Sequence, residues 1–463
     1  MSETLTAELR ALAESGGAAA FGVAGADPFQ RELLALQNHK DSGRAGPLRF
    51  TYGAPEVATD IRRSFPWAER LVVVGWNYLA VAAAPDPTGP LVGRFATSDQ
   101  YESVRHVAGA LATHLHQNGY RAEVLIDDNR LVDRAGAVRA GVGWSGKNTM
   151  LLAPGHGPWM LLGSVVTDAP LTTTDPMQRS CGTCVACIPA CPTNALDEQG
   201  LDARRCLSTW LQTPGSIPQW IRPLLGRRVY GCDECLTVCP PGTRALAAAE
   251  TKPSGLTFSE LLALSDEQLL DTFSWWYVPR RQGRFIRRNL LVAAGNAGEP
   301  EGWALVVSHL THPSSLIRGH AYWALARGWG GEARSVLRER LPHETVPQAR
   351  DELVLALIMI EHPAAHRALL AVDEWVGTDE ALRGLAVVGA AIGTEGLSLL
   401  VLYDGPEPSP IRREGVRLVC VEGTHPADVV QPLFTVYDPD RRLETWRRTL
   451  RSPSAAGGNQ VQI

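Results

Sequence analysis

Cysteine spacing constrains this chain more than any other feature of its sequence. Eight of its nine cysteines fall between residues 181 and 239. The first group reads Cys181-Gly-Thr-Cys184-Val-Ala-Cys187-Ile-Pro-Ala-Cys191-Pro192, which is a C-x₂-C-x₂-C-x₃-C-P run. In bacterial two-cluster ferredoxins, such a run gives three thiolates to one four-iron cube and sends the fourth to the other. The spacing therefore predicts two iron–sulfur clusters.

The second group, Cys232-Asp-Glu-Cys235-Leu-Thr-Val-Cys239-Pro240, is one close-spaced ligand short of a complete run. Cys206 lies alone between the two groups and supplies the missing thiolate. Two cubes with four thiolates each need eight cysteines, and eight are present. We assign them to a first cysteine set, Cys181, Cys184, Cys187 and Cys239, and a second cysteine set, Cys191, Cys206, Cys232 and Cys235.

Two other uses of cysteine were weighed. Paired C-x₂-C runs also hold zinc, but a tetrahedral site has no role for the third and fourth cysteines of the longer run. Disulfide frameworks are typical of small secreted chains, whereas this chain has 463 residues and an N-terminus without a basic start or an apolar run. Cys420 stands in an apolar stretch, where we expect an ordinary buried thiol.

Composition sets the outer bounds. A chain of 463 residues with 45% hydrophobic residues is expected to form more than one globular domain. The net charge of −5 gives no general attraction for nucleic acid, so any such contact must come from a local patch. No apolar stretch has membrane length, so we expect no membrane partner. Together with reduced thiols, this pattern indicates the cytoplasm.

Residues 1–170 alternate between helical and extended patterns, which predicts an α/β domain. Asp127 follows a predicted strand, and open α/β sheets bind ligands outside the carboxyl ends of their strands. Asp128 or Asn129 is placed to cap the next helix. The expected helices cover residues 5–12, 104–118 and 131–140, and the expected strands cover residues 21–24, 71–79, 122–127, 149–153 and 159–166.

A glycine-rich turn, Gly141-Val-Gly-Trp-Ser-Gly-Lys-Asn148, separates the last of these helices from the strand that follows. Its glycines let the backbone approach a ligand closely. The spacing to Lys147 is wrong for a P-loop, and no Ser or Thr follows that lysine. By itself the turn is equally consistent with a connection that binds nothing.

Several motifs in this order resemble the epoxyqueuosine reductase family. They are Leu131-Val-Asp-Arg134-Ala after Asp127, the glycine-rich turn, the cysteine run ending in Ala-Cys-Pro-Thr193, Arg205-Cys206-Leu-Ser208, Arg228-Val-Tyr-Gly-Cys-Asp233-Glu-Cys, and Gly283-Arg284-x-x-Arg287-Arg288-Asn289. The resemblance covers roughly residues 15–330 and implies a cobalamin-dependent iron–sulfur enzyme. It further implies reduction of an epoxide to an alkene in queuosine at the tRNA wobble position.

The resemblance also implies roles for single residues. Asp127 matches the proton donor of the family, and the alternative is that it caps the next helix, a role we assign to Asp128. Ser208 and Asp233 match positions that face the corrin of cobalamin. The same holds for the turn formed by Ser145, Gly146, Lys147 and Asn148. The implied partners are the anticodon stem-loop of tRNA and an electron donor of the flavodoxin or ferredoxin type.

Two departures from the family pattern keep alternatives open. The chain has Gln100-Tyr101-Glu102 where the family commonly shows Asp-Tyr-His, and Cys239-Pro-Pro-Gly242 where Cys-Pro-Trp-Asn is usual. One alternative is a related cobalamin and iron–sulfur reductase that acts on a different electrophilic small molecule. The other is a two-cluster electron-transfer protein, which leaves Asp127 and the glycine-rich turn without a function.

Residues 274–288 mix aromatic side chains with five arginines, Arg280, Arg281, Arg284, Arg287 and Arg288. Aromatic residues stack on unpaired bases and arginines neutralise phosphates, so the stretch predicts contact with single-stranded RNA. The alternative is a solvated helix start with a structural tryptophan pair. Residues 279–340 contain ten arginines and only four acids, an excess that favours a phosphate-bearing partner.

Beyond residue 287, helical segments separated by prolines predict HEAT-like repeats. The expected helices cover residues 304–310, 316–326, 349–360, 365–372, 380–391 and 411–421. The complete expectation is a monomer with an α/β cobalamin-binding domain at 1–170 and a ferredoxin-like domain at 171–250. HEAT-like helical repeats at 251–450 and a disordered tail at 451–463 follow.

Overall fold

The computed structural model of the chain describes residues 2–80, 82–84, 88–249, 253–361, 363 and 366, together with the backbone of three strands between 386 and 422. The chain divides into two compact units. The first unit contains Met1–Thr213, Arg228–Leu256 and Leu270–Arg281, and the second contains Pro214–Arg227, Thr257–Leu269 and Gln282–Ile463. The N-terminal layer and all eight clustered cysteines therefore belong to one unit, and the units do not divide near residue 170.

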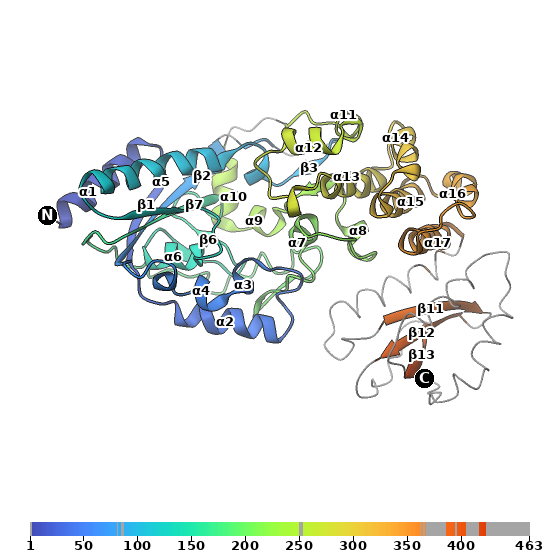
Figure 1. Cartoon of the computed structure of the whole chain (residues 1–463), viewed down its shortest axis with the longest axis horizontal. Helices are drawn as coiled ribbons and strands as arrows, with labels where there is room; N and C mark the ends of the chain where they lie inside the picture. Colours follow the sequence, from blue (N-terminus) through green and yellow to red (C-terminus); the bar gives the residue numbers. More distant parts are fainter. Residues whose placement is uncertain are drawn as a thin grey trace. The chain divides into compact units, whose positions relative to one another are not determined.

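A four-stranded sheet forms the centre of the first unit, in the order β1 (Ala20–Gly25), β2 (Arg70–Asn77), β7 (Met160–Thr167) and β4 (Ala122–Leu125) (Figure 1). Every neighbouring pair is antiparallel. Because β2 and β4 both oppose β7, they run in the same direction and end at the same edge. Asp127 follows β4 at that edge, so the rule for parallel sheets located it correctly although this sheet is antiparallel.

Helices cover both faces of this sheet. Helices α1 (Ser2–Ser15) and α5 (Gln100–Gln117) cover one face and α6 (Asp133–Arg139) covers the other (Figure 1). The residues of β2 alternate between them: Val72 and Val74 pack under α1 and α5, whereas Leu71 and Val73 pack on the side of α6. A strand buried on both faces is an unbroken apolar run, which explains why the sequence resembles a parallel sheet here.

Helix α5 begins at Gln100, four residues before its predicted start at residue 104. The carboxylate of Asp99 accepts the backbone N–H of Glu102 at 3.1 Å and so caps the helix. The earlier start brings Tyr101 and Arg105 into the first turns of α5. Gly119, with φ of +83°, lies just beyond its end.

The first unit has further elements, most of them short, and the longest of them, α2, was not predicted from the sequence. They are α2 (Gln30–Asp41), α3 (Phe50–Gly53), α4 (Pro55–Ala58), η1 (Ile61–Arg63), η2 (Tyr78–Ala80), β3 (Leu91–Val92), η3 (Arg94–Ala96), β5 (Trp144–Ser145), β6 (Leu151–Leu152), β8 (Leu196–Asp197), β9 (Gly200–Leu201), α7 (Leu207–Gln212), β10 (Arg228–Tyr230), α9 (Glu234–Thr237), α10 (Pro240–Ala247) and η4 (Pro279–Arg281). Most of the cysteine-rich stretch is therefore loop, since the thiols of a cube need close presentation rather than regular structure.

The second unit is helical as far as Glu361. Its helices are α8 (Ile221–Leu224), α11 (Phe258–Ala263), α12 (Asp266–Thr272, which continues into the first unit), α13 (Arg284–Ala297), α14 (Gly302–Ser308), η5 (His309–Thr311), α15 (Ser315–Trp329), η6 (Gly330–Ala333), α16 (Arg334–Arg340) and α17 (Pro347–Glu361). No helix in the described ranges is long and apolar enough to cross a membrane.

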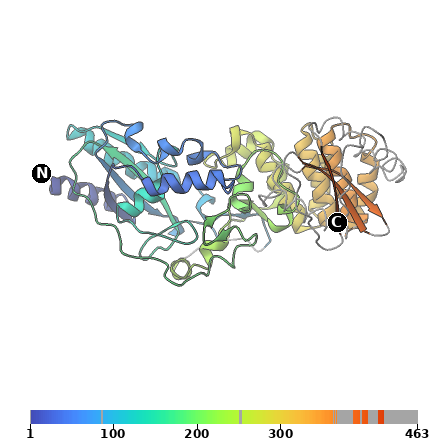
Figure 2. The ribbon, with the colours of Figure 1, turned by 90° about the horizontal axis from the view of Figure 1, so that it is seen from below.

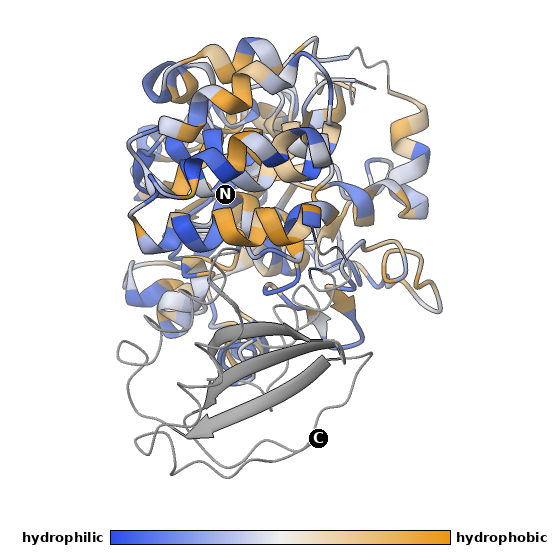
Figure 3. Cartoon of the chain, turned by 90° about the vertical axis from the view of Figure 1, so that its right-hand side faces the viewer, coloured by the Kyte–Doolittle hydropathy of each residue, from blue (hydrophilic) through white to orange (hydrophobic). Residues whose placement is uncertain are grey.

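Helix α15 packs against both α13 and α17, which lie beside it in Figures 1 and 2. Tyr322 and Trp323 of α15 are completely buried. Gly295 of α13 lies so close to α15 that a Cβ atom there would stand 2.6 Å from Cα of Ala324. Both apolar and polar residues occur along the helices of the chain (Figure 3). In α15, residues 319–326 are all buried, so its neighbours cover this helix on all sides there.

The helices predicted over residues 380–391 and 411–421 are wrong. The chain instead forms β11 (Ala386–Gly393), β12 (Gly396–Tyr403) and β13 (Val416–Glu422), with β12 antiparallel to β11 and parallel to β13. Valine-rich runs such as Val419-Cys420-Val421 favour extended backbone, and this preference prevailed over the helical periodicity. The helix predicted over 365–372 and the tail at 451–463 lie outside the described residues.

Candidate functional site

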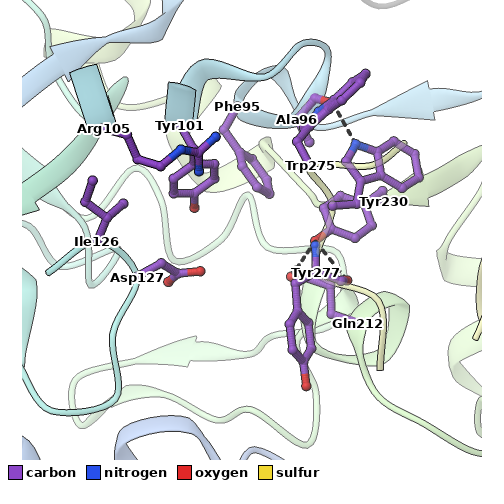
Figure 4. A pocket seen from close by; sticks show the side chains of 11 residues that line it. Phe95, Ala96, Tyr101, Arg105, Ile126, Asp127, Gln212, Tyr230, Trp275 and Tyr277 are labelled. Atoms are coloured by element: carbon purple, nitrogen blue, oxygen red, sulfur yellow. Dashed lines mark hydrogen bonds between the residues drawn. The ribbon is translucent and has the colours of Figure 1, made fainter. Parts of the chain in front are cut away.

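The first unit contains a cavity of about 410 Å³ at the edge of the sheet where β2 and β4 end. Its wall comes from α5, the loop after β4, the end of α7, β10 and the segment before η4. The residues that line it are Phe95, Ala96, Tyr101, Arg105, Ile126, Asp127, Gln212, Tyr230, Trp275, Trp276 and Tyr277 (Figure 4). A mostly aromatic wall around one carboxyl group is typical of an enclosed reaction site.

Asp127 projects its carboxyl group into this cavity (Figure 4). Its backbone is left-handed, with φ of +51°, a conformation that is strained for a residue with a side chain. Burial raises the pKa of Asp127 above its usual range, and the carboxylate of Asp133 raises it further, while Arg134 opposes the rise. A carboxyl group in this environment retains its proton at higher pH than a solvated one does.

The pKa of the neighbouring Asp128 is shifted in the opposite direction. Its carboxylate accepts hydrogen bonds from the Arg130 guanidinium at 2.7 and 2.9 Å and from the Arg130 backbone N–H at 2.8 Å. These bonds lower the pKa of Asp128. The prediction that Asp128 caps α6 is wrong. Its hydrogen bonds to Arg130 close a turn before that helix begins. Adjacent acids with oppositely shifted pKa values are a common mark of an acid–base site.

Tyr101 faces Asp127 across the cavity (Figure 4). Burial raises the pKa of Tyr101, and the nearby groups of Asp127 and Tyr230 raise it further. The hydroxyl of Tyr230 accepts the backbone N–H of Tyr277 at 3.0 Å and lies 3.2 Å from both Gln212 Oε1 and the Tyr277 carbonyl oxygen. These phenols are therefore neutral hydrogen-bonding groups within the wall.

The tryptophan pair closes another side of the cavity. Trp275 and Trp276 both donate their indole N–H to the carbonyl oxygen of Ala96, at 2.9 and 2.8 Å. Trp276 is buried and its ring stacks on Phe273 and on Tyr230, with centroid distances of 3.8 and 4.3 Å. Trp276 therefore has the structural role of the alternative interpretation, because its buried ring packs into the cavity wall.

The cavity wall continues directly into the second cysteine set. Gln212 ends helix α7, which begins immediately after Cys206. Tyr230 ends β10, two residues before Cys232. The segments that close the cavity therefore carry the cysteines predicted to hold a cube.

The eight cysteines lie near one another in the structure. Burial raises the pKa of the Cys239 thiol, and the nearby thiols of Cys181, Cys187 and Cys184 raise it further. Burial also raises the pKa of the Cys235 thiol, with further contributions from Cys232, Cys206 and Cys191 and from Cys187 of the first set. The division into two sets of four stays a prediction. All eight are free cysteines.

The distribution of these thiols fits a cube better than a single ion. Within the described residues, no three His, Cys, Asp or Glu side chains converge closely enough to share one metal ion. A four-iron cube holds its cysteines further apart than one zinc ion does, because each thiolate binds a different iron atom. Backbone N–H groups also point at sulfur, from Lys147 to Cys181 at 3.4 Å and from Ala195 to Cys191 at 3.2 Å.

The residues predicted to face cobalamin lie around these cysteines. Lys147 donates from Nζ to the carbonyl oxygen of Gly182 at 2.9 Å, and Asn148 donates from Nδ2 to the carbonyl oxygen of Cys235 at 3.4 Å. The intervening turn, from Ser145 through Gly146, joins β5 to β6. These contacts attach the glycine-rich turn to both cysteine sets, and its contact with a corrin stays a prediction.

The other two predicted cofactor residues are engaged within the protein. The hydroxyl of Ser208 accepts Nε2 of Gln212 at 2.9 Å. Asp233 accepts the backbone N–H of Arg94 at 2.8 Å and its guanidinium at 3.3 Å. Burial raises the pKa of Asp233, and the adjacent Arg94 opposes this rise.

Two of the five arginines predicted to bind RNA are buried, so that assignment is wrong for them. Arg287 donates to Asp266 at 2.6 Å and to the carbonyl oxygen of Leu264 at 2.6 Å. Arg288 is completely buried, and burial lowers its pKa to about 9. Helical periodicity turned these side chains inward, where they hold the second unit together.

The other three arginines are not buried. Arg280 and Arg281 are exposed and Arg284 is half-buried. Arg280 and Arg281 have left-handed backbones, with φ of 53° and 50°. The guanidinium of Arg281 donates to carbonyl oxygens of its own segment, at Ser274 and Trp276. Their contact with RNA stays a prediction.

Comparisons with known proteins agree with this geometry. A family model described as a 4Fe-4S double cluster binding domain matches residues 180–242. A curated epoxyqueuosine reductase from Aliivibrio fischeri is 30% identical over 332 residues, which cover 66% of this chain and 86% of that protein. The epoxyqueuosine reductase of Escherichia coli is 30% identical over 298 residues, which cover 60% of this chain and 77% of that protein.

Solved structures extend the likeness beyond the cysteine-rich stretch. A crystal structure of epoxyqueuosine reductase with an epoxyqueuosine-modified tRNA-Tyr stem loop has a TM-score of 0.70 and 27% identity, covering 77% of this chain and 99% of that chain. A structure of the Bacillus subtilis epoxyqueuosine reductase, with its catalytic aspartate loop swung out of the active site, has the same TM-score, identity and coverage.

Proposed function

Because the chain belongs to the epoxyqueuosine reductase family, we propose that it reduces epoxyqueuosine to queuosine at the wobble position of tRNA. The observation that carries this proposal is the partly enclosed cavity in which Asp127 faces aromatic residues and which adjoins the second cysteine set. An electron carrier without its own substrate has no use for such a cavity.

Two four-iron clusters are the first cofactors of this proposal. The first and second cysteine sets supply four thiols each, and N–H groups directed at Cys181 and Cys191 fit the sulfur-rich surroundings of a cube. These clusters would carry electrons from a protein donor of the flavodoxin or ferredoxin type to the cavity.

Cobalamin is the second proposed cofactor. The cavity has an aromatic wall and one carboxyl group free to face a ligand, and its wall segments lead to the second cysteine set. The turn from Ser145 to Asn148, together with Ser208 and Asp233, would hold the corrin. When bound, cobalamin supplies a strongly reducing cobalt centre that can deliver electrons to an epoxide carbon.

Asp127 supplies the acid. Reduction of an epoxide to an alkene consumes two electrons and two protons and releases the oxygen as water. The oxygen needs a proton as its bond to carbon breaks, and a carboxyl group with a raised pKa keeps its proton to higher pH than a solvated one does. The aromatic wall lowers the polarity around the Asp127 carboxyl group, which favours its protonated form.

The partner is tRNA, gripped through its anticodon stem-loop. Tyr277 lines the cavity and is 62% exposed, so it can stack on an unpaired base at the entrance. Arg280 and Arg281 follow it closely in the chain and can neutralise phosphates. The helices from α13 to α17 would form HEAT-like repeats, and the enzyme would be a cytoplasmic monomer.

The proposal is tested with tRNA that carries epoxyqueuosine. Anaerobically purified protein with reconstituted clusters and cobalamin is mixed with this tRNA and dithionite, and the nucleosides are then analysed by mass spectrometry. Conversion of epoxyqueuosine to queuosine is the expected result. If the epoxide persists while the protein reduces another electrophile, the alternative of a related reductase is correct.

A further inference from the structure

The first cysteine set reaches the protein surface at Cys184, which is exposed. Val185, the next residue, is 50% exposed, and Val238, which precedes Cys239 of the same set, is 38% exposed. Few large apolar side chains in the described residues are exposed to this degree. Two of them thus flank ligands of one predicted cube, at the place where the first cysteine set reaches the surface.

Basic side chains lie in the two stretches that carry the first cysteine set. Arg179 and Arg244 are both exposed. Residues 176–192 and 235–249 contain these arginines and no Asp or Glu, although Asp175, Glu234 and Glu250 directly flank them. Glu234 is paired with Arg228. We call Val185, Val238, Arg179 and Arg244, together with the exposed Cys184, the Cys184 patch.

Contacts within the first unit connect these arginines to the first cysteine set. The guanidinium of Arg179 lies 5.5 Å from the ring centroid of Trp144, and Trp144 packs against Cys239 in a small hydrophobic cluster. Helix α10, which carries Arg244, begins directly after Cys239. Both arginines are therefore tied to segments that carry the first cysteine set.

We propose that the Cys184 patch docks an acidic, low-potential electron-transfer protein that carries a flavin or an iron–sulfur centre. This inference rests on the proposed function. Each encounter oxidises the donor by one electron and reduces the first cluster by one electron. Two encounters supply the two electrons of one turnover. The second cysteine set adjoins the cavity instead, so electrons enter at one set and leave from the other.

The composition of the patch favours this partner over RNA. Exposed apolar side chains together with charged ones are typical of weak, transient protein interfaces. Opposite charge on the donor would steer it to the patch and accelerate association. RNA phosphates would also be attracted by the cations, but they gain nothing from Val185 or Val238. An electron donor also needs close approach to a cluster ligand, which Cys184 offers.

The test uses the holoenzyme with two reductants, reduced flavodoxin as the protein donor and dithionite as a small one. The double variant Arg179→Glu, Arg244→Glu and the single variant Val238→Asp are compared with Arg31→Glu and Leu34→Asp, an exposed arginine and an exposed leucine on α2. We expect kcat/KM for flavodoxin to fall by about tenfold in the patch variants and its salt dependence to weaken. The α2 variants should keep the wild-type value.

The dithionite series separates the outcomes. Unchanged rates with dithionite, together with normal iron content and normal affinity for tRNA, support a docking role. Equal losses with both reductants, or a loss of tRNA affinity, overturn it in favour of a structural or RNA-binding role. If wild-type protein does not reduce epoxyqueuosine at all, the proposed function fails. Bleaching of the clusters by flavodoxin, followed by stopped-flow absorbance, still tests the patch.

Discussion

Charged groups serve opposite purposes in the cavity of the first unit and in the helices of the second. Asp127 lines the cavity, has no hydrogen-bond partner in the described part of the chain, and has a strained backbone. Arg222 in the second unit is buried, and Glu352 binds its guanidinium, which also donates to Ser216, while its Nε donates to the carbonyl oxygen of Ile217.

The difference separates chemistry from scaffolding. A carboxyl group that faces a cavity without a hydrogen-bond partner is not stabilised as an anion, and such groups cluster at functional sites because the unpaired acid is free to react. A buried arginine with a complete set of partners holds segments together and has no proton to give. The presence of a charged group therefore does not identify a site, whereas its hydrogen-bonding state does.

The largest expected effect lies in the cavity. Asp127→Asn should lower the rate of epoxyqueuosine reduction by about 10²- to 10⁴-fold, because the acid that protonates the leaving oxygen is lost. Single-turnover assays with prereduced enzyme measure this step. Both clusters and cobalamin should remain, as their visible spectrum will show.

Asp128→Asn is the matched control, since it changes the adjacent acid, which Arg130 holds ionised. It should alter the rate by less than about tenfold. A wild-type rate in Asp127→Asn would remove this residue from the mechanism and end the contrast between the two units.

The next effect concerns the paired arginine. Glu352→Ala leaves Arg222 buried without its carboxylate and should lower the free energy of unfolding by about 3–5 kcal/mol in urea. Glu361 lies on the same helix, α17, and pairs with Arg338, whose side chain is 50% exposed. Glu361→Ala should cost less than about 1 kcal/mol. Equal effects of the two variants would contradict a scaffolding role for the buried pair.

A smaller loss is expected where α13 meets α15. Gly295→Ala places a methyl group 2.6 Å from Cα of Ala324, which forces the helices apart and should cost about 1–3 kcal/mol. Gly331→Ala is the control, because a Cβ atom there has no neighbour within 4 Å. Thermal unfolding of both variants distinguishes close helix packing from a general intolerance of alanine in this unit.

The smallest effect is a dependence of stability on pH. Because the folded-state pKa of Asp127 is raised, the folded protein holds a proton that the unfolded chain releases between the unfolded and folded pKa values. This contribution is complete below the unfolded pKa and is lost as pH rises through the folded pKa. Asp127→Asn should therefore gain stability relative to wild type across that window. A difference that does not change with pH would show that Asp127 is solvated in the folded protein.

Much of the first unit was predictable from the sequence. The strands of the sheet and helices α1, α5 and α6 were located to within a few residues, since their apolar patterns are strong. The antiparallel direction of the strands could not be predicted, because an apolar run buried on both faces has the same pattern in a parallel and in an antiparallel sheet. In the C-terminal region the apolar pattern favoured helices, and the valine-rich segments form strands.

Within the site, Asp127 was predicted from its motif and position, but Tyr101, Tyr230 and Trp275 were missed as parts of one wall. Tyr101 carried a signal, because it stands in the motif that departs from the family pattern. Tyr230 and Trp275 carried none, since they approach Asp127 only after distant segments of the chain fold together. Arg287 and Arg288 show the same limit, because a basic motif does not reveal which side of a helix is buried.

The sequence by itself determined the cysteine chemistry, because the thiolates of a cube are presented by short loops whose spacing is local. It also determined which acid is placed at the end of a strand. Only the tertiary structure decided which acid stays unpaired, which arginines face solvent, and that the cavity and the second cysteine set share segments. Burial and pairing depend on residues far apart in the chain, so no local pattern encodes them.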